Sequence, residues 1–324
     1  MSVLIAFLSL IVEFALGYPD WLFRAIGHPV TWFGRLISFL DLRLNRATDP
    51  DALRRQRGVQ ALLVIVLVPA IAGLCVQLVL LWFVPLGWIV AVFLATSLLS
   101  QKSLYEHVEA VADALDSGGL DMGRAAVSRI VGRDPETLDR AGVCRAAIES
   151  LAENFSDGIV APVFWTGVGG LAGGAAYKAA NTADSMIGHR TPRHEPFGWA
   201  AARFDDWINL PASRLTALLI VLASLLVEGA DPRGAWQAVR RDAKKHRSPN
   251  AGWPEAAMAG ALGLALAGPR SYGGVMVDDI FMGEGGRRDV DSGDIRRALK
   301  LYRVADYLLI GLFGLVALIA VLVF

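Results

Sequence analysis

The chain has 324 residues, of which 54% are hydrophobic and 19% charged, and its mean hydropathy is +0.46. This composition is too apolar for an ordinary soluble domain, and the apolar residues come in blocks, which predicts an integral membrane protein. Lys plus Arg and Asp plus Glu balance at 31 each, so nothing indicates nucleic-acid binding, and Cys75 and Cys144 lack the spacing of a zinc site or disulfide framework.

Seven apolar blocks follow one another along the chain. Two of them, 59–83 and 307–324, approach the ~20 uninterrupted residues that a membrane-spanning helix needs. The other five are short or interrupted by polar residues, proline or glycine: 2–16, 86–99, 158–177, 208–227 and 251–267. Broken segments at membrane depth usually face protein or a water-filled cavity. We therefore predict an all-α, polytopic helical membrane protein with short amphipathic cytoplasmic helices and some re-entrant or broken membrane segments.

The sequence of each block, and of the loops between the blocks, indicates how the block is placed in the membrane. Block 2–16 contains Glu13 and lacks the basic start and cleavage site of a signal peptide, so we expect it to remain as an anchor. Block 86–99 follows Pro85 and can form a hairpin with the span before it. Lys and Arg crowd every long loop, which simple alternation of all blocks across a membrane cannot explain. We expect the Gly/Ala-rich blocks 158–177 and 251–267 to dip into the membrane rather than cross it; close helix packing is the alternative use of the glycines.

The sequence between the blocks is organised rather than disordered. Leu104, Val108 and Leu115 recur at helical spacing, Gly118-Gly119 breaks this helix, and a second one is expected from Asp121 onward. We predict a single membrane domain with N-terminal helices in 1–100, a cytoplasmic helical insertion in 101–157, and membrane helices and motif loops in 158–324. Asp231-Pro232 is expected to start a basic helix that contacts anionic lipid, a phosphate or water.

Acidic and amide side chains gather just before block 158–177. If 141–157 is helical, a rotation of about 100° per residue places Glu149, Glu153 and Asp157 on one face, within roughly 80° of each other. Like charges at this spacing repel, and carboxylate oxygens are the ligands that Mg²⁺ prefers, together with substrate phosphates. We predict a metal site here, with Asn154 beside it. The alternative is a solvated helix end.

A second polar stripe follows the same block. On a helix, Lys178, Asn181, Asp184 and Ser185 share one face. A carboxylate can bind a metal, while a lysine offsets phosphate charge as a point charge. The alternative is a helix boundary with a lysine that reaches toward the membrane surface.

Two further clusters carry charge near apolar segments. Arg203, Asp205 and Asp206 precede Arg214, which lies inside block 208–227 and needs an anionic partner. That partner is either an anionic substrate or a structural salt bridge to Asp205 or Asp206. The turn-rich segment 246–255 includes Asn250 and ends at Glu255, which can alternatively complement the helix dipole. The sequence contains no P-loop, G-x-S-x-G or H-E-x-x-H motif, so we expect Mg²⁺-dependent handling of phosphate at a membrane face.

Six motifs, in order over nearly the whole chain, resemble the adenosylcobinamide-phosphate synthase family of CobD/CbiB type. They are His28-Pro29 with Trp32 and Gly34, Val131-Gly132-Arg133-Asp134, residues 145–162 with Glu149, Glu153-Asn154 and Ser156-Asp157-Gly158, Tyr177-Lys178 with Asn181 and Asp184-Ser185-Met186, Phe197-Gly198-Trp199 through Arg203 to Asp205-Asp206, and Ser248-Pro249-Asn250 through Gly252 to Pro254-Glu255. Two positions depart from the expected pattern. Phe155 stands where a small hydroxyl residue is expected, and Pro211 falls one residue early before Arg214.

The resemblance implies a multi-pass enzyme of the bacterial cell inner membrane, with its active site on the cytoplasmic face. Members use ATP to join adenosylcobyric acid to (R)-1-amino-2-propanol O-2-phosphate, or in some lineages ethanolamine phosphate, and an acyl phosphate is the expected intermediate. The resemblance thus implies Mg²⁺ and ATP, membrane lipid as surroundings, a possible homo-oligomer and contact with other late cobalamin-pathway membrane enzymes. As hypotheses, catalytic roles fall to Lys178, Asp184, Arg203 and Arg214, nucleotide or substrate binding to Asn154, Asn181, Ser185, Asp205, Asp206 and Asn250, and metal binding to Glu149, Glu153, Asp157 and Asp184.

Two other classes compete with this interpretation. Intramembrane transferases of phospho-alcohols or prenyl groups also place Asn and Asp with Mg²⁺ at a bilayer face, but the Asp spacings here do not reproduce their signatures. AmpE-like membrane proteins are distant relatives proposed to act in sensing. The acidic and basic motif residues are all retained here, which argues against a degenerate relative.

Overall fold

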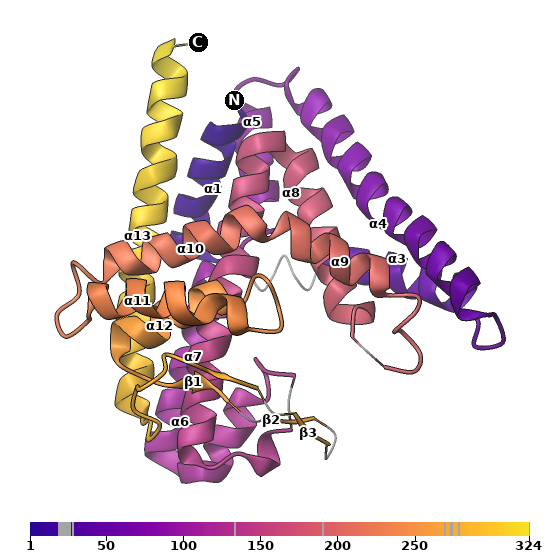
Figure 1. The fold of residues 1–324 in the computed structure, drawn as a ribbon. Coiled ribbons are helices and arrows are strands. Elements are labelled where there is room, and N and C mark those ends of the chain that lie inside the picture. The colour runs from indigo at the N-terminus through magenta and orange to yellow at the C-terminus, as the bar shows by residue number, and fades with distance from the viewer. Residues whose placement is uncertain are drawn as a thin grey trace. The chain divides into compact units, whose positions relative to one another are not determined.

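The computed structural model describes residues 1–18, 27, 29–132, 134–189, 191–268, 270–272, 275–277 and 279–323. His28 and Arg133, which belong to two of the motifs above, lie outside these residues. The chain forms two compact units, each described by itself: unit 1 comprises 1–100, 161–209 and 312–324, and unit 2 comprises 101–160 and 210–311. Most of the described chain is helical (Figure 1), which confirms the all-α prediction.

The described residues of unit 1 form six helices and the C-terminal end of a seventh. These are α1 (Ser2–Leu16), α3 (Pro29–Leu44), α4 (Asp51–Leu80), α5 (Leu86–Thr96), α8 (Ala161–Ile187), α9 (Trp199–Ile208) and the last turns of α13 (Ser292–Val323). Along α4 most apolar side chains are exposed, as expected for a helix with one face packed on protein and the rest facing lipid. Helix α5 follows α4 after a five-residue connection and contacts it, which agrees with the predicted hairpin.

Four helical stretches of the described chain are long and apolar enough to cross a membrane, and a fifth is added if α9 and the helix after it act as one. The four are Asp51–Leu80, Leu86–Val127, Arg140–Ile187 and Ser292–Val323. This agrees with a polytopic membrane protein. Length and composition alone do not make each stretch a straight span, as α8 shows.

Helix α8 reverses direction at Gly170. The backbone there has φ 61° and ψ −149°, a conformation that is essentially restricted to glycine. A Cβ atom at Gly173 would overlap the carbonyl oxygen of Trp165, eight residues earlier. In a continuous helix these residues would be separated by about 12 Å along the axis, so the two halves of α8 must pack side by side. The 158–177 block therefore turns back on itself at Gly170, which agrees with the expectation that it does not cross as one straight helix.

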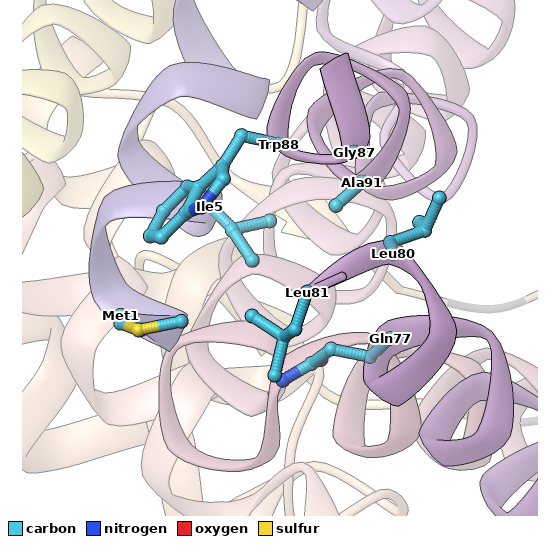
Figure 2. Close-up of a pocket in the computed structure, with 8 residues that line it drawn as sticks. All are labelled: Met1, Ile5, Gln77, Leu80, Leu81, Gly87, Trp88 and Ala91. Atoms are coloured by element: carbon cyan, nitrogen blue, oxygen red, sulfur yellow. The ribbon is translucent and has the colours of Figure 1, made fainter. Parts of the chain in front are cut away.

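The turn at Gly170 is held by α4. The backbone N–H of Leu171 donates to Oε1 of Gln77 at 2.8 Å, so an amide in a long apolar helix satisfies a donor left free by the break. Figure 2 shows Gln77 beside an apolar pocket between α1, α4 and α5, with Ile5 and Trp88 on its wall. The pocket has a volume of about 10 Å³, room for about one water molecule. It is a packing defect rather than a ligand site.

A buried carboxylate anchors the loop between α8 and α9 to α3. Asp41 accepts hydrogen bonds from Nη2 of Arg193 at 2.7 Å and from Nδ2 of Asn45 at 2.8 Å. Burial alone would raise the pKa of Asp41, but the hydrogen bonds from Arg193 and Asn45 outweigh it and hold that pKa below its usual value. In the same unit, apolar side chains of α3, α4, α8 and α9, together with Phe197 of the loop before α9, form one core that includes Ile37 and Ile65.

Where unit 2 is described, it combines helices with two small antiparallel strand pairs. Its elements are α6 (Gln101–Val127), η1 (Pro135–Thr137), α7 (Arg140–Phe155), the π-helix η2 (Ser156–Val160), α10 (Leu210–Ala223), α11 (Pro232–Asp242), η3 (Ala243–Lys245), α12 (Gly252–Leu262), β1 (Leu266–Ala267), β2 (Arg270–Tyr272), β3 (Val275–Val277), β4 (Phe281–Met282) and the first part of α13. Strand β1 pairs with β4 and β2 with β3. Helices α11 and α12 lie side by side, and α10 packs against both (Figure 1). The sequence indicated none of the four strands, which are only two or three residues long.

The predicted helix break in the 101–157 segment is confirmed. Gly119 has φ 73° and ψ −160°, and its neighbours on either side form separate helical runs within α6. The buried stripe includes Leu104, Val108 and Leu115, as the periodicity predicted. Helix α13 fastens to this segment through Arg296, which pairs with Asp116 at 2.7 Å.

Helix α12 is too short to cross a membrane. It has 11 residues, about half of the ~20 that a span requires. It ends at Leu262 with Gly263 in the left-handed conformation, and the chain continues into β1. This length agrees with the expectation that 251–267 does not cross, and its dipping into the membrane stays a prediction. The basic helix expected after Asp231-Pro232 is α11, where Oδ1 of Asp231 accepts the N–H of Arg233 at 2.9 Å.

Candidate functional site

In unit 1, the side chain of Asp205 is fixed by two amides. Nδ2 of Asn181 donates to Oδ1 at 3.3 Å, and Nδ2 of Asn209 donates to Oδ2 at 2.9 Å. The hydroxyl of Tyr177 donates to Oδ1 of Asn209 at 2.8 Å. Asp205 is 7% exposed and Asn209 is completely buried. Helices α8 and α9 pack together, so this network sets the position of one acidic side chain between them.

Two further carboxylates lie near Asp205. Asp184 repels both Asp205 and Asp206 electrostatically, so the three acids occupy one region of unit 1. Arg203 compensates part of this charge, with Nη1 at 4.0 Å from Oδ2 of Asp206. Asp184 and Asp206 are half-buried, whereas both oxygens of Asp205 already accept amide hydrogen bonds. Asp184, Asp205, Asp206, Asn181 and Arg203, which the sequence placed on two separate stripes, therefore lie in one region of unit 1. Their role as a functional site stays a prediction.

The remaining residues of the second stripe are also on α8. Lys178 is half-buried and Ser185 is exposed. The hydroxyl of Ser185 donates to the carbonyl of Asn181 at 3.0 Å, so it is turned toward its own helix. Ser185 thus has a local structural partner, and Lys178 remains a candidate for offsetting phosphate charge.

The first acidic stripe, in unit 2, does not form one uniform surface. Glu149 is 2% exposed, and its Oε1 accepts the N–H of Ala267 at 2.9 Å. Ala267 has a left-handed φ of 59°, so this hydrogen bond holds a strained residue. Glu153 is exposed, and Asp157 is half-buried in the π-helix, where the α-helical spacing assumed for the stripe no longer applies. Metal binding by these three residues stays a prediction.

Asn154 is tied to its own helix. Its Nδ2 donates to the carbonyl of Ser150 at 2.9 Å and to the Ser150 hydroxyl at 3.1 Å. That hydroxyl in turn donates to the carbonyl of Ile130 at 2.8 Å. These contacts connect the end of α7 to the loop after α6. In the part of the chain that the structure describes, no group of three or more His, Cys, Asp or Glu side chains is arranged to hold a metal ion.

Arg214, also in unit 2, is surrounded by neutral groups. Its Nη1 donates to the carbonyl of Leu210 at 3.2 Å, to Oγ of Ser213 at 3.0 Å and to Oδ1 of Asn250 at 3.4 Å. Its guanidinium stacks on the ring of Trp253, 4.5 Å from the centroid. Among the described residues of unit 2, no carboxylate pairs with Arg214, so the positive charge of Arg214 stays available to an anionic group.

The loop before α12 holds Asn250 in place. Oγ of Ser248 accepts the N–H of Asn250 at 3.2 Å and that of Ala251 at 3.3 Å, and the N–H of Ser248 donates to Nδ1 of His246 at 3.0 Å. Nε2 of His246 lies 3.8 Å from Oε1 of Glu255, which is almost fully buried. Hydrogen bonds therefore define the loop conformation around Asn250.

Three residues that shape these clusters were not predicted as site residues: Asn209, Tyr177 and Trp253. Asn209 lies four residues after Asp205, which places both on one face of a helix and is a usable sequence signal. The contact between Tyr177 and Asn209 joins two helices, and Trp253 meets Arg214 through the packing of α10 on α12. Neither of these two contacts can be predicted from a local sequence pattern.

Comparison with known proteins gives one consistent result. A family model described as CobD/Cbib protein matches residues 6–302. A protein from Sinorhizobium sp named Cobalamin biosynthesis protein CobD is 50% identical over 317 residues, covering 98% of each chain. Proteins of the same name from Rhizobium meliloti (strain 1021) and Rhodobacter capsulatus are 50% and 48% identical, covering 93% and 96% of this chain and 93% and 95% of their own. No solved structure matches the chain.

Proposed function

Because the chain belongs to the CobD/CbiB family, we propose that it acts in cobalamin biosynthesis as an adenosylcobinamide-phosphate synthase. In this reaction the carboxylate of adenosylcobyric acid forms an amide with the amine of (R)-1-amino-2-propanol O-2-phosphate or ethanolamine phosphate. One ATP is converted to ADP and phosphate. We propose that the enzyme lies in the bacterial inner membrane and takes its substrates from the cytoplasmic side.

The reaction needs activation because a carboxylate does not react with an amine at neutral pH. A carboxylate oxygen of the corrinoid attacks the γ-phosphorus of ATP, ADP leaves, and an acyl phosphate forms. The amine then attacks the acyl carbon, phosphate leaves with that oxygen, and the amine loses a proton. Protein groups contribute by orienting these species and by offsetting negative charge on the phosphates.

The observation that carries the proposal is the gathering of Asp184, Asp205 and Asp206 around Asn181 and Arg203 in unit 1. The donor set fits Mg²⁺, which is commonly held by one or two carboxylates together with substrate phosphates. Asp184 and Asp206 would be its ligands, because the two oxygens of Asp205 are engaged by amides. When bound, Mg²⁺ would offset the charge of the nucleotide phosphates.

The other residues have supporting roles in this proposal. Asp205 positions Asn181 through their hydrogen bond, and Arg203 and Lys178 provide positive charge for phosphate oxygens. Arg214, whose charge is not compensated within unit 2, is a candidate for binding an anionic group of a substrate. Asn250 fixes the direction of its guanidinium.

The test is a synthase assay with purified protein in detergent, adenosylcobyric acid, the amino-alcohol phosphate and Mg-ATP. We expect the wild type to form adenosylcobinamide phosphate, and Asp184→Asn to lose turnover by at least about a hundredfold. Asp51→Asn is the matched control, because Asp51 is an acid of the same unit with its side chain 82% exposed. Absence of product from folded wild-type protein rejects the proposal.

A further inference from the structure

A cavity of about 280 Å³ lies in unit 2 at the turn that follows β4. Its walls include Ile280, Phe281, Glu284, Gly285 and Arg288. This volume is slightly below the range usual for drug-sized ligands, so the cavity suits a small metabolite rather than a nucleotide or a corrinoid. None of these residues belongs to the carboxylate cluster of unit 1.

The cavity presents one cation and one anion. The guanidinium of Arg288 stacks on the ring of Phe281, 4.3 Å from the centroid, and the described residues give it no carboxylate partner. The carboxylate of Glu284 is 3.6 Å from Arg241 and 3.5 Å from Lys245, both longer than hydrogen bonds. It can therefore still accept a hydrogen bond from a ligand.

Most of the charge around Glu284 is balanced. Arg241 donates to Oδ2 of Asp242 at 2.7 Å and Lys245 to Oδ1 of Asp242 at 3.2 Å. The two bases and the two acids thus cancel, and Arg288 is left as an excess positive charge. A ligand with net negative charge and one cationic group complements this arrangement.

Hydrogen bonds define the conformation of the turn that forms the wall of the cavity. Oδ2 of Asp242, which is fully buried, accepts the N–H of Gly283 at 3.0 Å and that of Glu284 at 3.2 Å. The N–H of Gly286 closes a turn on the carbonyl of Gly283 at 2.9 Å. Gly285 has a φ of 84°, which a larger residue would adopt only with strain. Glu284 therefore extends from a fixed turn, as a binding group must.

We infer that this cavity binds a phosphate monoester that carries a primary amine, with the phosphate on Arg288 and the ammonium on Glu284. The inference rests on the proposed function, because the amine substrate named there has this chemistry. A phosphate monoester is a dianion near neutral pH and the ammonium carries one positive charge, so the ligand has the required net negative charge. The headgroup of phosphatidylethanolamine shares the two groups but is a phosphodiester with a single negative charge.

The test is calorimetric titration of the full-length protein in detergent with O-phosphoethanolamine, ethyl phosphate and glycerophosphoethanolamine. Arg288→Gln is expected to weaken binding of O-phosphoethanolamine and ethyl phosphate about tenfold or more, the effect of losing one charge-assisted hydrogen bond. Glu284→Gln is expected to weaken binding of O-phosphoethanolamine alone. Arg233→Gln, which removes an exposed cation of α11, is the matched control and leaves all affinities unchanged.

Two results overturn the inference. One is an unchanged affinity for O-phosphoethanolamine in both variants, with elution and thermal unfolding like the wild type. The other is binding of the diester glycerophosphoethanolamine as tight as that of the monoester, which assigns the cavity to a lipid headgroup. The synthase assay separates the two proposals. If the Arg288 and Glu284 variants weaken binding but the wild type forms no product, only the synthase reaction is rejected. If the wild type forms product and Arg288→Gln leaves the KM for the amine substrate unchanged, only binding of that substrate in the cavity is rejected.

Discussion

The side-chain amide of Asn209 donates a hydrogen bond of 2.9 Å to Oδ2 of Asp205, and Asn209 is completely buried. Asn209→Ala removes this donor and also the acceptor of the Tyr177 hydroxyl. Leaving a buried carboxylate without its donor costs about 1–3 kcal/mol, so we expect lower thermal stability together with a large loss of turnover.

Tyr177→Phe is the control for this prediction, because it removes one neutral hydrogen bond and leaves Asp205 with both amides. Its expected cost is about 1 kcal/mol, with turnover close to that of the wild type. Thermal unfolding and the synthase assay on both variants check this. Equal loss of turnover in the two variants would show that the Asn209–Asp205 contact has no special role.

Gly170→Ala is expected to destabilise the protein by about 1–3 kcal/mol, because alanine is strained at this backbone conformation. The new methyl group would also overlap the side chain of Gln77, which accepts the N–H of Leu171. Gly169→Ala is the matched control, since its added Cβ would meet no atom within 4 Å. Thermal unfolding in detergent measures both. Similar stability of the two variants would contradict the reversal at Gly170.

Asp242 makes stability depend on pH. Burial alone raises the pKa of Asp242, but hydrogen bonds from Arg241, Lys245 and two backbone N–H groups lower it to about 2. A folded-state pKa below the unfolded value of about 3.9 stabilises the folded state by about 2 kcal/mol above pH 4, and this contribution is lost as the pH falls toward 2. Thermal unfolding of wild type and Asp242→Asn between pH 6 and pH 2.5 measures it. We expect the difference to shrink with falling pH; a constant difference would refute the assignment.

Substitutions at Glu149 can distinguish a structural role of this side chain from a role in metal binding. Its Oε1 accepts the N–H of Ala267, and the amide oxygen of a glutamine can do the same. Glu149→Gln is therefore expected to keep both stability and the Mg²⁺ dependence of turnover, while Glu149→Ala loses about 1–3 kcal/mol of stability. Titration of turnover with Mg²⁺ is the measurement. A raised Mg²⁺ requirement in Glu149→Gln would instead support the metal role.

Local patterns predicted much of the fold. The Gly118-Gly119 pair marks the break in α6, and the glycine-rich block 158–177 predicted that α8 does not simply cross. The position of the reversal could not be predicted, because several glycines of that block are equally able to adopt a positive φ. What selects Gly170 is the contact of its neighbour Leu171 with Gln77, about ninety residues earlier in the chain.

The candidate site was predicted only as separate stripes. Helical spacing placed Asn181 and Asp184 on one face of α8, and the proximity of Asp205 to both depends on the packing of α9. The π-helix at 156–160 and the contact of Glu149 with Ala267 likewise arise from tertiary structure. The stripe around Glu149 was predicted by extending an α-helical spacing that ends at Phe155.

The central claim is that this chain uses ATP to activate a corrinoid carboxylate for amide formation. The most direct measurement is a synthase reaction with adenosylcobyric acid labelled with ¹⁸O in the reacting carboxylate, followed by mass spectrometry of both products. The account predicts one ¹⁸O atom in the released phosphate and one in the new amide. Formation of the amide with unlabelled phosphate, or ATP hydrolysis without amide, would contradict it.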